Sequence, residues 1–280
     1  MWLLASHLGC EPTERAVYER RLATPPGDYA ASLLRATNTD LLLVDEGFPP
    51  PGAGTTTSEL GELAGCKARP VMRIESVAER AGVEGVREAV GRARSRGYVG
   101  LKTIAAYRGG LDLDASPTPV RTALLAALEA NEATGDPLPV QVHTGFGDSD
   151  LLLPAADPGL LRPLVERFGQ TTWVLLHCYP FVREAGWLAH VYANVYFDLS
   201  LTIPHVARPA AALHEALELA PASKLLYASD ASRTPELYLL AARAWREALA
   251  EVLPTLLPED AAAHAARLIL RENARAVYRL

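Results

Sequence analysis

The chain has 280 residues, of which 49% are hydrophobic and 21% are charged, and its formal net charge is −6. The length suits a single β/α barrel, and the hydrophobic fraction can supply a large buried core. Because the Lys and Arg residues are scattered, the sequence lacks the clustered basic face that nucleic-acid binding requires, and no nucleic-acid partner is expected.

The sequence also argues against a membrane or secreted protein. No apolar run approaches the roughly 20 residues that a membrane-spanning helix needs. The opening segment, Met1–His7, has no basic flank and only a short apolar run, so it does not resemble a signal peptide. Cys10, Cys66 and Cys178 are odd in number and far apart, which argues against a disulfide framework. These features favour a cytoplasmic location.

Helix-like sequence occupies the start of the chain, in the segments Met1–Gly9, Glu11–Leu22 and Tyr29–Ala36. Short stretches rich in Val, Leu and Ile then alternate with helical patterns, as expected for parallel strands that are covered on both faces. Their first residues recur at intervals close to the ~30 residues of one βα unit. The predicted strands are Leu41–Val44, Val71–Ile74, Val99–Ile104, Val140–His143, Trp173–His177, Val195–Leu199 and Leu225–Ser229.

Capping patterns mark helices between these strands. Thr56 and Glu59 have the spacing of a capping box, and so do Ser76 and Glu79. The alternation of strands and helices predicts an α/β fold with one parallel sheet. Because no compositional break marks a linker, we expect residues 1–280 to form one domain.

The number of strands is one short of a closed barrel. A (β/α)8 barrel has eight strands, and only seven are recognised, so the sequence predicts an incomplete barrel. The alternative is an open doubly wound sheet, which needs no eighth strand. That alternative lacks the Gly-rich nucleotide loop that would follow an early strand.

Candidate catalytic side chains lie where strands end, which is where barrel enzymes place them. His143 and His177 each end a predicted strand, and Asp230 follows Ser229 at the end of another. Imidazole nitrogens and carboxylate oxygens are ligands for zinc and similar divalent ions. We therefore predict a metal site formed by these three side chains, with Asp230 as a ligand, as the base that activates water, or as both.

Other polar residues near strand ends are candidates for substrate contacts. Lys102 lies within a strand and is assigned a catalytic role, either as a carboxylated metal bridge or in contact with substrate; alternatively, it pairs with a carboxylate inside the barrel. Arg108 and Arg183 follow strands and either bind a substrate carboxylate or form surface ion pairs. Tyr107 and Tyr179, in the same loops, are also predicted to contact substrate.

Several motifs together resemble the amidohydrolase-related (amidohydrolase 2) superfamily. The closest branch is the domain that is also found fused ahead of glutamine-synthetase-like proteins. The resemblance runs from about Gly9 to the C-terminus. The motifs that carry it are Gly100–Arg108, Gln141–Asp148, Leu176–Pro180, Asn194–Ser200, Leu226–Asp230 and Glu272–Tyr278.

The resemblance implies a metal-dependent barrel, usually with zinc, that hydrolyses C–N or related bonds or, in some branches, decarboxylates. By that similarity His143 and His177 match histidines after the fifth and sixth strands, and Asp230 matches the aspartate after the eighth. Lys102 lies on the strand that matches the fourth.

One departure from the family pattern is serious. The family's first strand ends in a His-x-His pair that supplies two metal ligands, and this chain contains no such pair. The segment Trp2–Pro12 resembles the region after that strand. We therefore expect the first strand to be missing, with the true start upstream of Met1, and metal affinity to be weak.

Three hypotheses remain for the function. The first is a hydrolase of a small molecule, and the second is a metal-dependent decarboxylase on the same scaffold. The third is a truncated, non-catalytic barrel that acts as a binding module. The unpaired strand edges of an incomplete barrel would also favour association with another chain, including a second copy.

Overall fold

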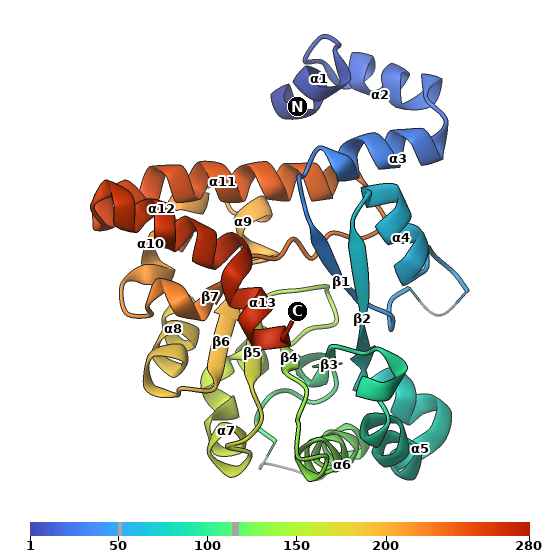
Figure 1. Ribbon diagram of the computed structural model, residues 1–280, viewed down its shortest axis with the longest axis vertical. Helices are drawn as coiled ribbons and strands as arrows, with labels where there is room; N and C mark the ends of the chain where they lie inside the picture. Colours follow the sequence, from blue (N-terminus) through green and yellow to red (C-terminus); the bar gives the residue numbers. More distant parts are fainter. Residues whose placement is uncertain (50–51, 114–117) are drawn as a thin grey trace.

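The computed structural model describes residues 1–49, 52–113 and 118–280, and it contains a parallel sheet curled into a half-barrel (Figure 1). Every predicted strand overlaps an observed one, so the predicted α/β fold is confirmed. The strands are β1 (Leu41–Asp45), β2 (Lys67–Arg73), β3 (Gly100–Thr103), β4 (Val140–His143), β5 (Trp173–Leu176), β6 (Val195–Asp198) and β7 (Leu225–Leu226).

The sheet follows chain order from β1 to β7, and each neighbouring pair is parallel. Among the described residues, β1 pairs only with β2 and β7 only with β6, so the sheet is not closed. This arrangement is that of an incomplete β/α barrel, as the strand count predicted.

Helices surround the sheet, and three of them precede β1, as predicted for the start of the chain. None of the helices in the described ranges combines the length and apolar character needed to cross a membrane. The α-helices are α1 (Trp2–Leu8), α2 (Glu14–Ala23), α3 (Pro26–Arg35), α4 (Thr57–Ala64), α5 (Ile74–Gly91), α6 (Pro119–Ala133), α7 (Arg162–Arg167), α8 (Val182–Val191), α9 (Thr202–His205), α10 (Pro209–Leu217), α11 (Glu236–Leu256), α12 (Glu259–Arg267) and α13 (Asn273–Tyr278). Short 3₁₀ turns are η1 (Arg94–Arg96), η2 (Ala105–Tyr107), η3 (Leu153–Ala156), η4 (Pro158–Leu161) and η5 (Ala222–Lys224), and η6 (Leu268–Glu272) is a π-helical turn.

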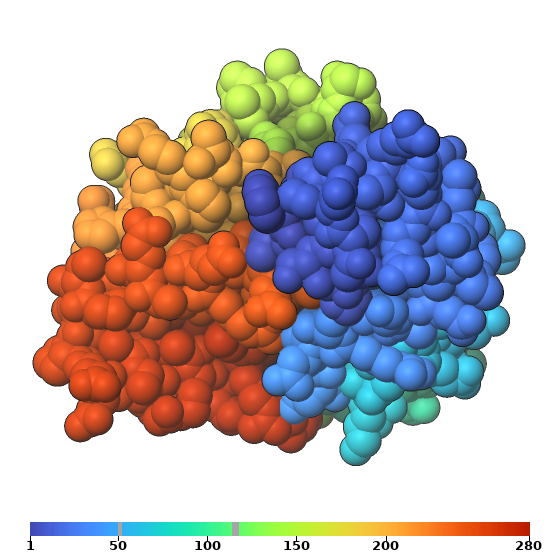
Figure 2. All heavy atoms as spheres, turned by 90° about the horizontal axis from the view of Figure 1, so that it is seen from above, coloured from blue at the N-terminus to red at the C-terminus, as the bar shows by residue number. Residues whose placement is uncertain are grey.

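The N-terminal helices pack against the long helix α11 near the end of the chain. Figure 2 shows the N-terminal segment, in blue, beside the orange and red C-terminal helices. The buried hydroxyl of Tyr29 in α3 donates a hydrogen bond to Glu236 of α11 at 2.9 Å, and Arg21 of α2 lies 3.1 Å from the same carboxylate. This buried contact fixes the position of the N-terminal helices on the barrel.

One of the two predicted capping boxes is confirmed. The Thr56 hydroxyl accepts from the Glu59 amide, and the Glu59 carboxylate accepts from the Thr56 amide at 2.8 Å. The Ser76–Glu79 box is wrong because α5 already begins at Ile74, directly after β2, so Ser76 lies within the helix. Without non-helical backbone at Ser76, its hydroxyl cannot act as an N-cap.

The last helix, α13, fills the interior of the curled sheet. Its Val277 and Tyr278 pack against inward-facing apolar residues, and the Tyr278 hydroxyl accepts a hydrogen bond from Gln141 of β4 at 2.8 Å. A Cβ atom on Gly100 would lie 3.1 Å from the Tyr278 ring, so a residue without a side chain suits that position. The interior residues are Leu43, Val174, Leu176, Tyr196 and Leu226.

Candidate functional site

Polar side chains gather at the carboxyl ends of the strands. Asp45, Arg73, His143 and Asp198 are the last residues of β1, β2, β4 and β6, and His177 directly follows β5. All five are mostly or fully buried around one end of the sheet. Since parallel strands of a barrel place their carboxyl ends at the same rim, this rim is the candidate site.

Two histidines form the centre of the site. The ring centroids of His143 and His177 are 4.6 Å apart, with an interplanar angle of 60°. The Nε2 atoms of both rings are buried, and neither has a hydrogen-bond partner in the described ranges. An unpaired buried nitrogen is costly, and each such atom calls for an explanation such as an ion or water. Asp230 Oδ2 lies 3.9 Å from His177 Nε2, so the structure brings the three predicted ligands into one region.

The surroundings keep both imidazoles neutral. Burial, and then the charges of His177 and Lys102, lower the pKa of His143 to about 2. Burial and the charge of Lys102 likewise hold the pKa of His177 well below its ordinary value. A neutral imidazole has a nitrogen lone pair, which is the form that binds a metal ion.

We predict that His143 destabilises the metal-free protein as the pH falls below about 6.5, the ordinary pKa of histidine, whereas Asp198, with its raised pKa, acts in the opposite direction. The unfolded chain binds a proton at His143 near that pH, whereas the folded chain keeps His143 neutral down to about pH 2, so acid favours unfolding. Each such histidine contributes a slope of about 1.4 kcal/mol per pH unit. Urea unfolding at a series of pH values measures this slope. His143→Phe should remove the contribution of one histidine to the pH dependence of the unfolding free energy. An unchanged pH dependence in this variant would contradict the prediction.

His177 is held by a set of buried hydrogen bonds. Its φ of 68° is in the left-handed region, which costs a non-glycine residue of order 1 kcal/mol. The amide of His177 donates to Asp198 at 2.8 Å, and Thr202 donates to the His177 carbonyl at 2.7 Å. Burial raises the pKa of Asp198 to about 6, although the hydrogen bonds that it accepts from His177 and Ser200 oppose this shift.

Sequence reasoning did not assign a role to Asp198 or Ser200. A signal was present, because Asp198 lies at a strand end, as His143 does. The strand-end criterion could therefore have found it. Ser200 lies two residues beyond Asp198, and only the fold brings it to His177.

A buried ion cluster lies at the ends of the first three strands. Asp45 pairs with Arg73 and, at 3.2 Å, with the amino group of Lys102. Burial would raise the pKa of Asp45, but the charges of Lys102 and Arg73 and the Arg73 hydrogen bond outweigh it and lower that pKa. Of the predicted alternatives for Lys102, the structure shows the pair with a buried carboxylate, and its catalytic role stays a prediction.

Aromatic residues surround the mouth of the site. The ring of Tyr107 lies 4.6 Å from that of His143, and the Tyr107 hydroxyl accepts from the Asp148 amide at 3.1 Å. Tyr179 is partly exposed and makes an edge contact with Phe146, with centroids 5.9 Å apart. Tyr107 is thus placed beside the histidine pair, while Tyr179 lies at the rim.

Comparison with known proteins decides the family. The amidohydrolase family profile matches residues 7–280. The chain belongs to the amidohydrolase family. Protein fluG of Emericella nidulans is 39% identical over 164 residues, which cover 56% of this chain and 19% of that protein, so the chain spans about a fifth of that relative. A crystal structure of a "putative metal-dependent hydrolase" from Lactobacillus casei is 29% identical, with a TM-score of 0.85, and the match covers 99% of this chain and 83% of that one.

These findings confirm the predicted superfamily and support a hydrolase of the amidohydrolase type. Two arginines predicted either to contact substrate or to form surface ion pairs, Arg183 and Arg108, lie near carboxylates in the structure. Arg183, on α8, pairs at 2.7 Å with Glu215 of α10 in the outer helical layer, as the surface alternative proposed. Arg108 lies 3.8 Å from Asp150, and both side chains are exposed. The structure does not bring Arg183 into the histidine cluster.

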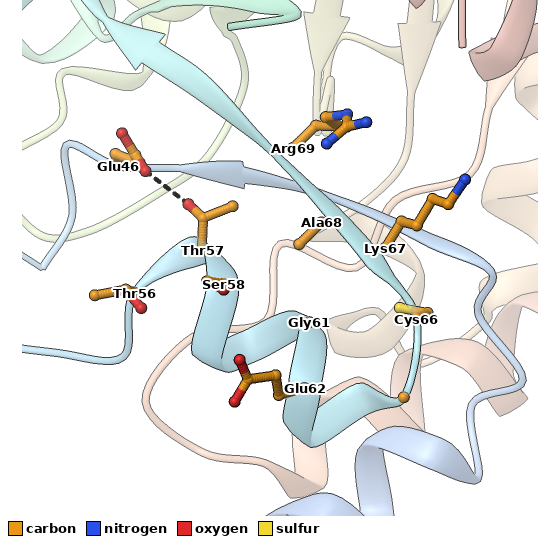
Figure 3. Close-up of a pocket in the computed structure, with 11 residues that line it drawn as sticks. Glu46, Thr56, Thr57, Ser58, Gly61, Glu62, Cys66, Lys67, Ala68 and Arg69 are labelled. Carbon is orange, nitrogen blue, oxygen red and sulfur yellow. Dashed lines mark hydrogen bonds between the residues drawn. The ribbon is translucent and has the colours of Figure 1, made fainter. Parts of the chain in front are cut away.

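A separate groove of about 880 Å³ opens between α4 and β2 (Figure 3). Thr57 donates a hydrogen bond to Glu46 within it at 2.7 Å, and Lys67 and Arg69 extend from β2. Neither His143 nor His177 lines this groove. Because the buried histidine pair lies at the strand ends, we place the candidate active site there and not in this groove.

Proposed function

We propose that this chain is a metal-dependent hydrolase that acts on amide-like C–N or related bonds of a small molecule. The observation that carries the proposal is the pair of buried Nε2 atoms on His143 and His177, which have no partner among the described side chains. Two unpaired imidazole nitrogens beside a carboxylate, at the catalytic rim of an amidohydrolase, are suited to bind a divalent cation.

The donor chemistry favours zinc. Catalytic zinc sites use imidazole and carboxylate ligands and keep one position for water. His143, His177 and Asp230 offer donors of these two kinds. Within residues 1–49, 52–113 and 118–280, no group of three or more His, Cys, Asp or Glu side chains lies close enough to form a ready metal site. The proposal therefore rests on the two imidazoles, with Asp230 as the third donor.

The protein's own residues would perform the remaining chemistry. Zinc held by His143 and His177 would supply Lewis acidity and would lower the pKa of a nearby water toward about 7. Asp230 Oδ2, beside His177 Nε2, is placed to accept a proton from the attacking water and to pass it to the leaving nitrogen. Lys102, held by Asp45, keeps further N–H donors for the oxygen of an amide or an anionic group. The ring of Tyr107 packs against that of His143 and would shield it from water on that side.

Zinc binding by the metal-free protein tests the proposal. We expect one equivalent of zinc to bind in isothermal titration calorimetry, and binding to be lost in the double variant His143→Ala/His177→Ala. His264→Ala, on the exposed face of α12, is the matched control and should bind zinc as the unaltered protein does. Equal binding by the double variant, or no binding by the unaltered protein, would defeat the proposal.

A substrate panel separates hydrolysis from decarboxylation. The zinc-loaded protein should release ammonia or an amine from amides, and Asp230→Asn should slow that release by about 10²–10⁴-fold, the usual contribution of a general base. Release of carbon dioxide without amine would assign the chain to the decarboxylase alternative. Amide hydrolysis that is unaffected by Asp230→Asn would remove Asp230 from its proposed role.

A further inference from the structure

A buried hydrogen-bond chain leads away from the Nδ1 atom of His177, on the other side of the ring from Nε2. His177 Nδ1 lies 2.7 Å from the Ser200 hydroxyl oxygen. The same hydroxyl lies 2.7 Å from Asp198 Oδ1, which also accepts the Ser200 amide at 2.9 Å. All three side chains are at most 2% exposed, so bulk water does not compete for these bonds.

The position of each proton in this chain follows from the acceptors. Ser200 has one hydroxyl proton, and two neighbours could accept it, the Asp198 carboxylate and the His177 ring. A carboxylate is the stronger acceptor, because a charge-assisted hydrogen bond is about twice as strong as a neutral one. The Ser200 proton therefore goes to Asp198, and the Ser200 oxygen is left to accept. His177 must then carry its proton on Nδ1.

We propose that Ser200 is a positioning residue that, together with Asp198, fixes His177 in the Nδ1–H tautomer. This tautomer leaves the lone pair on Nε2, the buried atom that has no partner in the described parts of the chain and that lies 3.9 Å from Asp230. The use of that lone pair in zinc binding rests on the proposed function, whereas the tautomer itself does not.

The same carboxylate also holds the backbone of His177. Asp198 Oδ1 accepts the backbone amide of His177 at 2.8 Å, and Thr202 Oγ1 donates to the His177 carbonyl at 2.7 Å. The backbone of His177 is thereby held on both sides, while Ser200 holds the imidazole. Ser200 is the group in this set that determines which ring nitrogen is protonated.

Nitrogen NMR of the metal-free 280-residue protein tests the tautomer directly. With ¹⁵N-labelled histidine, His177 is expected to show a protonated Nδ1 and an unprotonated Nε2, assigned by comparison with His177→Gln. In Ser200→Ala, Nδ1–H loses its acceptor, and the tautomer should shift toward Nε2–H, which faces Asp230. A protonated Nε2 in the unaltered protein, or an unchanged tautomer in Ser200→Ala, would overturn the proposal.

Thr202→Val is the matched control, because it also deletes one buried hydroxyl bonded to His177 but acts at the backbone. It should lower thermal stability and retain the Nδ1–H tautomer.

Zinc affinity should fall about 10–100-fold in Ser200→Ala, the usual effect of losing a group that orients a metal ligand, and only slightly in Thr202→Val. Equal loss of zinc affinity in both variants would reduce Ser200 to a structural role. If the unaltered protein shows the expected tautomer but binds no zinc, the proposed function fails and the tautomer assignment stands.

Discussion

Asp45→Asn is expected to lower the free energy of unfolding by about 3–5 kcal/mol, the usual cost of removing one partner from a buried ion pair. Asp45 is the carboxylate that the structure pairs with both Arg73 and Lys102, and these three side chains are 9–16% exposed. Asparagine keeps the shape but removes the charge, so two buried cations lose their compensation. Urea unfolding of the metal-free protein at neutral pH measures the difference.

An exposed ion pair provides the control for this prediction. Arg15 and Glu19 lie 2.7 Å apart with side chains 88% and 61% exposed, and Glu19→Gln should cost less than about 1 kcal/mol. Adding Arg73→Met to the Asp45→Asn variant should restore part of the lost stability, because one unpaired charge is removed. Similar losses for Asp45→Asn and Glu19→Gln would show that the cluster contributes no more than a surface pair.

Acid should diminish the difference in unfolding free energy between the unaltered protein and Asp45→Asn. The folded protein holds the pKa of Asp45 below its ordinary value of 3.8. A lowered carboxyl pKa contributes stability that is present above the unfolded pKa and is lost as the pH falls through the folded pKa. The two unfolding free energies should therefore converge below about pH 4.

The fold was largely predictable from the sequence because its signals are local. A parallel strand covered on both faces is a short continuous apolar run, and each such run predicted one observed strand. His143 and His177 were found for the same reason, since a strand end can be located without knowing the fold. The Ser76 capping box failed because the fold starts α5 directly after β2, and spacing alone does not contain that information.

Contacts between distant segments set the limit of sequence reasoning. Asp45 and Arg73 are 28 residues apart, and their ion pair exists only because β1 and β2 lie side by side. Arg183 was left between a substrate contact and a surface ion pair, and the structure pairs it with Glu215 of α10. Whether a polar residue near a strand end faces the site depends on how the following helix turns.

The packing of the C-terminal helix α13 against the sheet is a further contact between distant segments that the sequence did not predict. Its removal should also have a large effect on stability. Tyr278→Ala is expected to lower the free energy of unfolding by about 3–5 kcal/mol, the usual cost of truncating a buried aromatic ring. Tyr278 is 5% exposed, and its ring lies inside the curled sheet, against Gly100 of β3. Its loss would leave a cavity that the surrounding strands cannot close without moving. Urea unfolding measures the change.

Tyr278→Phe separates the ring from the hydroxyl. It keeps the packing but removes the acceptor for Gln141, so we expect a loss of about 1–3 kcal/mol, the cost of an unsatisfied buried polar group. Tyr18→Ala, at a position that is 61% exposed on α2, should change stability by no more than about 0.5 kcal/mol. If Tyr278→Ala were as mild as Tyr18→Ala, α13 would not be part of the barrel's core. The half-barrel would then have to be stabilised by the packing of its outer helices alone.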